Sequence, residues 1–365
     1  MTKRPPSVAP VPCKARVKNS IIPVPPPLDL LAQALFAGFV DSFVVVRTLS
    51  LVSRRLSSLS ANRVRALDLH ATVHSHTLLT TCVLPRYHGG LVSLSLQWTP
   101  ATTDATVALL AQALPRLTHL NLHGCKAVTN RAVSSISAAL PALTSLNLSF
   151  CAGIDDVRPL AALSHLRVVK LAMCQRLPSF TLSTLPPSVT ELDVGCSPVA
   201  CDDALLRRFR HLEVLDLSGC FVEAAHVVAC TRGTTTSLSS LSLAHCHTLS
   251  LADLWRMWHP MPTLKVLVLR GLLEDDGGDV DAARRRWAAR VRACVPSLTY
   301  LDISCSDRHV DSKRMLQELM PHLVVDDGHA AFPIHPCACG DEDEDVGGGR
   351  TAEQRVLVVR PHVMA

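Results

Sequence analysis

Cysteine and histidine are the residues of this sequence with the clearest capacity for chemistry, because the 365-residue chain contains 14 Cys and 17 His. Thiolates and imidazoles bind zinc, and a Cys–His pair can supply a nucleophile. The tightest grouping lies near the C-terminus, at His329, His335, Cys337 and Cys339. No C-x-x-C pair accompanies it, and an acidic, glycine-rich run follows at residues 341–349. The pattern favours a disordered tail over a metal site, and we expect no metal.

Catalytic motifs of the common enzyme classes are missing from the sequence. It contains no G-x-x-x-x-G-K-[ST] loop, no G-x-G-x-x-G turn, no H-E-x-x-H helix and no G-x-S-x-G elbow. His119 and His123 would share one strand face, but a natural zinc site needs a third ligand. We therefore expect a protein that is not an enzyme and that uses no cofactor.

The composition indicates a large folded core in a soluble protein. Hydrophobic residues make up 48% of the chain and charged residues 18%, which excludes disorder throughout. The net charge of +5 forms no basic stripe, so we expect no nucleic-acid partner. The longest apolar stretch, around residues 28–40, is too short for a membrane span and contains Asp29 and Gln33. Without a signal peptide, we expect a cytoplasmic or nuclear protein with reduced thiols.

Five of the cysteines end copies of one repeated pattern, L-x-x-L-x-L-x-x-C. They are Cys125, Cys151, Cys174, Cys220 and Cys246. Weaker copies of the pattern begin at Val64, Leu91, Val189, Leu264 and Leu298. Together these make ten copies at intervals of 23 to 34 residues. Every interval but the last, which is 34 residues long, lies within the range typical of leucine-rich repeats.

Each repeat predicts a short strand followed by a helix or a turn. The L-x-L pair places two leucines on the inward face of a strand, and the residue between them faces solvent. Apolar residues recur at helical spacing in Asp104–Leu114 and Asn130–Leu140, and Pro115 and Pro141 stop these helices. One unit cannot bury its apolar side alone. We therefore expect an α/β leucine-rich-repeat solenoid of about ten repeats, with a parallel concave sheet and a helical convex side.

The repeat also predicts a structural role for its cysteines. Stacking places equivalent residues of neighbouring repeats about 5 Å apart, so the five thiols would form a column along the solenoid. A column does not provide the tetrahedral ligand set of a zinc site. We expect buried thiols that act as weak hydrogen-bond donors to neighbouring backbone.

The cysteine at the turn, followed by residues 127–130 and a helix, resembles the cysteine-containing subclass of leucine-rich repeats. That subclass is typical of F-box proteins, the substrate receptors of cullin-based ubiquitin ligases, and the resemblance covers about residues 64–306. Before the repeats, residues 26–31 are similar to the start of an F-box, and residues 51–55 are similar to its third helix. Two features depart from the family: Leu56 stands where Trp is usual, and Asp29 follows directly on Leu28 in a displaced register.

The resemblance implies that a helical F-box-like module binds a small Skp-type adaptor, which bridges to a cullin. The apolar residues that would form the adaptor-binding surface are Pro27, Leu28, Leu31, Leu35, Phe36 and Val52. The alternative from the residues alone is an amphipathic cap over the first repeat. The protein would then be a free-standing leucine-rich-repeat scaffold or adaptor with no ubiquitin role.

The concave sheet is the expected binding face for a protein target, since residues beside the inward leucines point to solvent. Predicted target-binding residues along this face are Trp98, His119, Asn121, His123, Asn147, Phe150, Lys170, Met173, Asp193, Asp216, His245 and Arg270. Aromatic and Met side chains are plausible anchors, with polar neighbours as a rim. A merely solvated ladder of small polar residues is the alternative. Asp193 and Asp216 either contact a basic partner or repel each other in water.

Four segments follow from these patterns. Residues 1–24 form a disordered basic, proline-rich arm, residues 25–62 the F-box-like module, residues 63–325 the solenoid, and residues 326–365 an acidic, glycine-rich disordered tail. Within the solenoid, arginines around residues 284–292 predict a long amphipathic helix with a solvated basic face, which we favour over a nucleic-acid or nuclear-import patch.

Overall fold

The computed structural model describes residues 65–69, 79–87, 90–199, 209–233, 237–250, 254, 259–272, 280–304 and 310–326. The predicted F-box-like module, the basic arm and residues 327–365 lie outside these ranges, as does the grouping at His329–Cys339. The predicted adaptor-binding residues also lie outside them: Pro27, Leu28, Leu31, Leu35, Phe36 and Val52.

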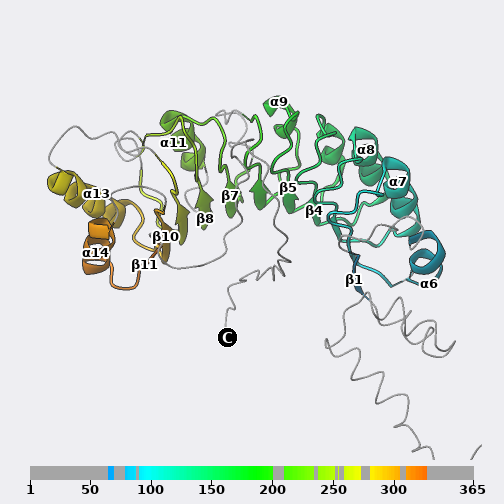
Figure 1. The fold of residues 1–365 in the computed structure, drawn as a ribbon, viewed down its shortest axis with the longest axis horizontal. Coiled ribbons are helices and arrows are strands. Elements are labelled where there is room, and N and C mark those ends of the chain that lie inside the picture. Colours follow the sequence, from blue (N-terminus) through cyan, green and yellow to red (C-terminus); the bar gives the residue numbers. More distant parts are fainter. Residues whose placement is uncertain are drawn as a thin grey trace, which may run out of the picture.

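One parallel sheet runs through the described residues, and its strands follow one another in chain order. The strands are β1 (Ala66–Asp68), β2 (Ser93–Ser95), β3 (His119–Asn121), β4 (Ser145–Asn147), β5 (Val168–Lys170), β6 (Glu191–Asp193), β7 (Val214–Asp216), β8 (Ser240–Ser242), β9 (Val266–Val268), β10 (Tyr300–Asp302) and β11 (Val324–Asp326). Figure 1 shows an arch with these strands along its inner side. The predicted α/β solenoid with a concave parallel sheet is confirmed, and β11 adds one strand to the ten expected.

Helices and turns cover the outer side of the arch (Figure 1). They are a π-helix at Leu79–Val83, α6 (Leu84–Tyr87), α7 (Asp104–Ala113), α8 (Asn130–Ala139), a 3₁₀ helix at Arg158–Ala162, α9 (Ser179–Leu182), α11 (Ala224–Gly233), α13 (Val280–Cys294) and α14 (Val310–Leu319). The predicted helices at 104–114 and 130–140 are confirmed, with Leu114 and Leu140 as C-caps. The arginine-rich segment is helical in α13. None of the helices in the described ranges has both the length and the apolarity of a membrane span.

The core is a stack of leucines, because the strands pair without a shift in register. Leu94 aligns with Leu120, Leu120 with Leu146, and the same alignment continues through Leu192 and Leu215. These middle residues of the strands are 3% exposed or less. Each repeat thereby buries its apolar side only against its neighbours, as the sequence pattern requires.

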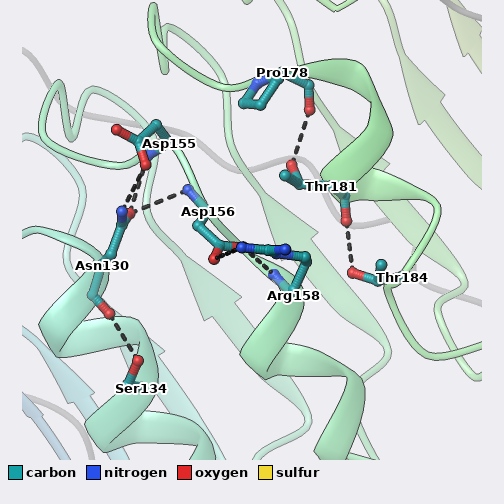
Figure 2. Close-up of polar contacts among 8 residues, drawn as sticks. All are labelled: Asn130, Ser134, Asp155, Asp156, Arg158, Pro178, Thr181 and Thr184. Atoms are coloured by element: carbon teal, nitrogen blue, oxygen red, sulfur yellow. Dashed lines mark hydrogen bonds and ion pairs between the residues drawn. The ribbon is translucent and has the colours of Figure 1, made fainter.

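Polar side chains at the helix starts join consecutive repeats on the convex side. Asn130, which opens α8, accepts hydrogen bonds through Oδ1 from the N–H groups of Asp155 (3.0 Å) and Asp156 (3.1 Å) of the next repeat (Figure 2). Its Nδ2 donates to Asp155 Oδ1 at 2.6 Å. One repeat earlier, Asp104 accepts from Thr129 N (2.7 Å) and Oγ1 (2.6 Å). These bonds satisfy backbone donors that would otherwise remain unpaired where the chain turns.

In the following repeat, the equivalent residue does not bind the backbone of the next repeat (Figure 2). Asp156 occupies the place of Asp104 and Asn130, but its carboxylate accepts from Arg158 N (2.9 Å) and Nη2 (2.8 Å) within its own repeat (Figure 2). Around α9 the side-chain hydrogen bonds stay within one repeat: Thr181 Oγ1 donates to Pro178 O at 2.9 Å, and Thr184 Oγ1 donates to Thr181 O at 2.7 Å. Side chains at the helix starts therefore join the repeats of β2, β3 and β4, whereas Asp156 does not continue the series.

The predicted cysteine column is confirmed. Each Sγ donates to the backbone carbonyl of the last inward residue of the preceding repeat, at 3.2 to 3.4 Å. Ser197 takes the same position after β6 and donates to Leu171 O at 2.8 Å. Burial raises the pKa of the Cys174 and Cys220 thiols to about 12, so both remain protonated. The column is a set of hydrogen-bond donors that links the repeats.

Candidate functional site

One backbone feature recurs at the carboxyl end of the strands. The third residue after each strand from β2 to β9 has a φ between 52° and 71°, in the left-handed region. These residues are Trp98, Gly124, Phe150, Met173, Cys196, Gly219, His245 and Gly271. Glycine adopts this conformation freely, whereas other residues pay about 1 kcal/mol or more. Four predicted target-binding residues, Trp98, Phe150, Met173 and His245, occupy this strained position.

Hydrogen bonds to the next repeat hold the strained residue in place. Trp98 N donates to His123 O at 2.7 Å, Phe150 N to Ala172 O at 2.8 Å, and Met173 N to Gly195 O at 2.7 Å. The parallel ladder thus continues past the strand ends into the turn. Because this bond recurs in every repeat from β2 to β9, the left-handed conformation persists whatever side chain the position carries.

Trp98, His123 and Phe150 meet at the carboxyl ends of β2, β3 and β4, and we call these three residues the aromatic cluster. The Trp98 and His123 ring centroids are 4.9 Å apart in an edge-to-face arrangement, as are those of His123 and Phe150. Trp98 and Phe150 lie 5.6 Å apart although they belong to repeats that are not adjacent. Gly124 between them makes this approach possible. Trp98 remains 42% exposed, so the cluster presents aromatic surface to solvent.

In β3, β4, β6 and β7, a side-chain oxygen of the last strand residue accepts a hydrogen bond from the backbone N–H two residues later. Oδ1 of Asn121 accepts from His123 N at 3.0 Å, and Oδ1 of Asn147 accepts from Ser149 N at 3.0 Å. Asp193 Oδ1 accepts from Gly195 N (3.1 Å), and Asp216 Oδ1 accepts from Ser218 N (2.9 Å). All four were predicted to bind the target. Each therefore has a structural role in the turn, and Asn121 also donates through Nδ2 to Gln97 Oε1 at 3.3 Å.

Asp193 and Asp216 align directly across β6 and β7, and we call them the carboxylate pair. Both side chains are half-buried. Burial and the neighbouring charge of Asp216 raise the pKa of Asp193 to about 7. Neither Oδ2 atom receives a hydrogen bond from any residue of the described part of the chain. The pair therefore has unused acceptor capacity.

Lys170 and Glu191, beside the carboxylate pair, neutralise each other. Lys170 Nζ lies 2.9 Å from Glu191 Oε1, on neighbouring strands. The Lys170 charge lowers the pKa of Asp193, but this is a smaller effect than burial and Asp216. The predicted target-binding residue Lys170 is thus already paired within the protein.

The remaining predicted residues do not join these groups. His119 is exposed, and its Nδ1 is 2.7 Å from Thr118 Oγ1. His245 lies beyond β8, six strands from Trp98, where burial and the Arg270 charge lower its pKa. Along the described residues no three His, Cys, Asp or Glu side chains gather in a way that would hold a metal ion.

Sequence reasoning missed the glycines that alternate with the large side chains. A Cβ at Gly124, Gly219 or Gly271 would overlap the Trp98 ring, Cys196 Sγ (2.6 Å) or His245 Nδ1 (2.6 Å), respectively. The fixed offset of these glycines from the strands was available as a signal. Strand alternation also predicts a solvent-facing Asp302, but this residue is fully buried and accepts from Ser304 N (2.9 Å) and Oγ (2.7 Å) through Oδ1.

No protein-family model and no curated protein sequence matches this chain. Solved structures resemble it in fold. A chain of the yeast Rad7–Elc1 complex has 15% identity and a TM-score of 0.48, with 82% of this chain and 87% of that chain covered. A chain of the TLR13–ssRNA13 complex has 18% identity and a TM-score of 0.46, with 77% and 42% covered. An internalin from Listeria monocytogenes has 16% identity and a TM-score of 0.41, with 70% and 78% covered.

Proposed function

We propose that this protein is a protein-interaction subunit that binds a target on its concave face, and that it is the substrate-recognition subunit of an SCF-type cullin ubiquitin ligase. The cysteine column carries the proposal. Its recurrent thiol-to-carbonyl bond gives a physical basis to the cysteine-containing repeat, the subclass typical of F-box proteins. The F-box resemblance of residues 25–62 and the exposed aromatic cluster support it further.

In this function the chain itself makes and breaks no covalent bond. Residues Pro27, Leu28, Leu31, Leu35, Phe36 and Val52 would bind the Skp-type adaptor, and the concave face would bind the target. Holding the two together raises the effective concentration of a target lysine near the ubiquitin-loaded enzyme. The proposed compartment is the cytoplasm or nucleus, consistent with the free thiols of the cysteine column.

A pull-down of the full-length chain with a purified Skp-type adaptor tests the ligase role. Wild type should retain the adaptor, and Leu31→Asp should lose it, because a charge would be placed in an apolar interface. Leu109→Asp is the matched control, since Leu109 lies on α7 and is 38% exposed. Circular dichroism should show intact solenoids in both variants. Absence of retention by wild type would overturn the ligase role and leave the free-standing scaffold.

A further inference from the structure

The concave face is acidic although the whole chain is basic. The outward-facing residues of the eleven described strands include four carboxylates that reach solvent, at Asp68, Glu191, Asp193 and Asp216, whereas Asp302 and Asp326 are buried. They include one cationic side chain, Lys170, which is already paired with Glu191. The chain as a whole has a formal net charge of +5. Arg270 adds a cation two residues past β9, so the excess of negative charge on this face lies around β6 and β7, where a basic partner would complement it.

The carboxylate pair is the part of this face with free acceptor capacity. Asp193 and Asp216 each direct Oδ1 to a turn N–H, which fixes the two carboxylates in place. Gly195 lies between them: a Cβ there would be 3.5 Å from Asp193 Oδ1 and 3.6 Å from Asp216 Oδ1. Absence of a side chain at Gly195 leaves room beside both carboxylates. The pair is therefore pre-organised, and a cation beside it would offset the mutual repulsion.

The aromatic cluster is an independent feature of the same face. Trp98 and Phe150 occupy the left-handed position, where the chain elsewhere uses Gly124, Gly219 and Gly271. Burial of these side chains compensates little for the backbone strain, because Trp98 is 42% exposed and Phe150 is only half-buried. Strain retained at an exposed aromatic residue indicates a use outside the fold, and aromatic side chains are frequent anchors of protein interfaces.

We propose that the target is bound through an extended basic segment, which places a Lys or Arg on the carboxylate pair and an apolar or aromatic side chain on the aromatic cluster. This inference rests on the proposed use of the concave face for target binding. Phe150 and Asp193 are two strands apart across the sheet and three residues apart along it, a diagonal of about 14 Å. At about 3.3 Å per residue, the two side chains of the segment are separated by about four positions.

The electrostatics of Asp193 agree with this geometry. Its raised pKa reflects burial and the charge of Asp216, and a bound cation would oppose both effects. Binding a basic segment near neutral pH should therefore release protons from the protein.

Selection from a displayed library of random dodecapeptides on the immobilised full-length protein tests the proposal. Wild type should enrich Lys or Arg about four positions from Trp, Phe, Tyr or Leu. A synthetic copy of the top selected peptide is then titrated by fluorescence anisotropy, with EDTA and with CaCl₂. Asp193→Asn with Asp216→Asn should weaken binding at least tenfold. Trp98→Gly should remove the apolar preference and keep the basic one.

The chain itself provides the controls. Asn121 and Asn147 show that an Asn accepts the turn hydrogen bond at this repeat position, so the Asp→Asn variants keep the fold. Asp156→Asn removes the same charge from the convex side and should leave the affinity unchanged. Thermal unfolding should show that all variants remain folded.

Several outcomes would overturn the inference. In the selection, these are the recovery of no peptide or of peptides without Lys or Arg enrichment. In the titration, they are equal affinity of the double Asp→Asn variant and wild type for the peptide, or peptide binding that requires Ca²⁺, which would assign the carboxylates to a metal. The adaptor pull-down separates this inference from the ligase role. Adaptor binding without basic enrichment removes the inference alone, whereas basic enrichment without adaptor binding removes the ligase role alone.

Discussion

The indole ring of Trp98 lies over Gly124, in the space that a side chain at residue 124 would fill. A Cβ built on Gly124 would come within 2.7 Å of Trp98 Cδ2. This contact allows Trp98 to reach toward Phe150, whose repeat is not adjacent to its own. The glycine thus determines whether the aromatic cluster exists, and the relationship can be tested directly.

Gly124→Ala should destabilise the protein by more than backbone strain alone. The left-handed φ of residue 124 costs an Ala about 1 kcal/mol, and displacement of the indole adds to this. In a Trp98→Gly background the overlap is gone, and only the strain remains. A double-mutant cycle from urea unfolding should give a coupling of about 1 kcal/mol, whereas additive effects would contradict the contact.

At Met173, whose φ is 59°, side-chain shape should matter more than hydrophobicity. Met173→Gly removes the strain and should leave the stability unchanged or raise it, despite some lost packing. Met173→Val places a β-branched residue at positive φ and should lower the stability by about 1–2 kcal/mol. Chemical denaturation of the three proteins measures the order. A Val variant as stable as the Gly variant would show that the backbone does not hold this conformation.

The thiols of Cys151 and Cys174 should resist modification in the native protein. Both are fully buried, and burial raises their pKa values, so almost no thiolate is present at neutral pH. Half-buried Cys196 should label faster with maleimide, and all the cysteines should label in guanidinium. Mass spectrometry maps the sites. Rapid native labelling of Cys151 or Cys174 would be inconsistent with the column. Free reaction at Cys13, Cys337 and Cys339, outside the described residues, stays a prediction.

Asp193 should give the protein a characteristic pH dependence of stability. Its pKa is raised to about 7 in the folded state, against about 4 for an unfolded Asp. Between these values the folded state holds a proton that the unfolded state has released, so the contribution of Asp193 to stability falls as the pH rises. Asp193→Asn removes the titrating group. The stability of the variant relative to wild type should therefore increase from pH 4 to pH 7 in urea unfolding.

The variant Asp216→Asn tests directly whether the neighbouring carboxylate raises the pKa of Asp193. Removing the Asp216 charge eliminates the second largest of the three causes of the raised pKa, so the titration of Asp193 should move toward a lower pH. Carboxyl carbon chemical shifts followed by NMR report this titration. An unchanged Asp193 pKa would mean that the two carboxylates do not interact.

The repeat pattern predicted most of the fold, because leucines at fixed spacing are both the signal in the sequence and the contacts in the core. Leu120, Leu146 and Leu215 are buried as expected. Strand β11 escaped prediction for a physical reason. Its central residue, Val325, pairs with Leu301, but His322 and Asp327 stand where earlier repeats carry apolar residues. A terminal repeat has a neighbour on one side only, so its pattern is relaxed.

The candidate site was predicted less completely, since its organisation depends on backbone geometry. The strand pattern places Asn121 and Asp216 on the solvent side, but it does not show that one oxygen of each is used in a turn. Likewise, Trp98 and Phe150 are separated by 52 positions in the sequence, and only the left-handed backbone with Gly124 between them brings their rings together.

Because the strands pair without a shift in register, the distance between two sites on the concave face is set by the number of strands between them. Duplication of one repeat between β4 and β6 would move the aromatic cluster and the carboxylate pair apart by about 5 Å without altering either. Deletion of one would bring them closer by the same step. The distance between two contact sites in such a protein can therefore change in steps of one strand spacing through gain or loss of whole repeats, while the residues that make the contacts stay as they are.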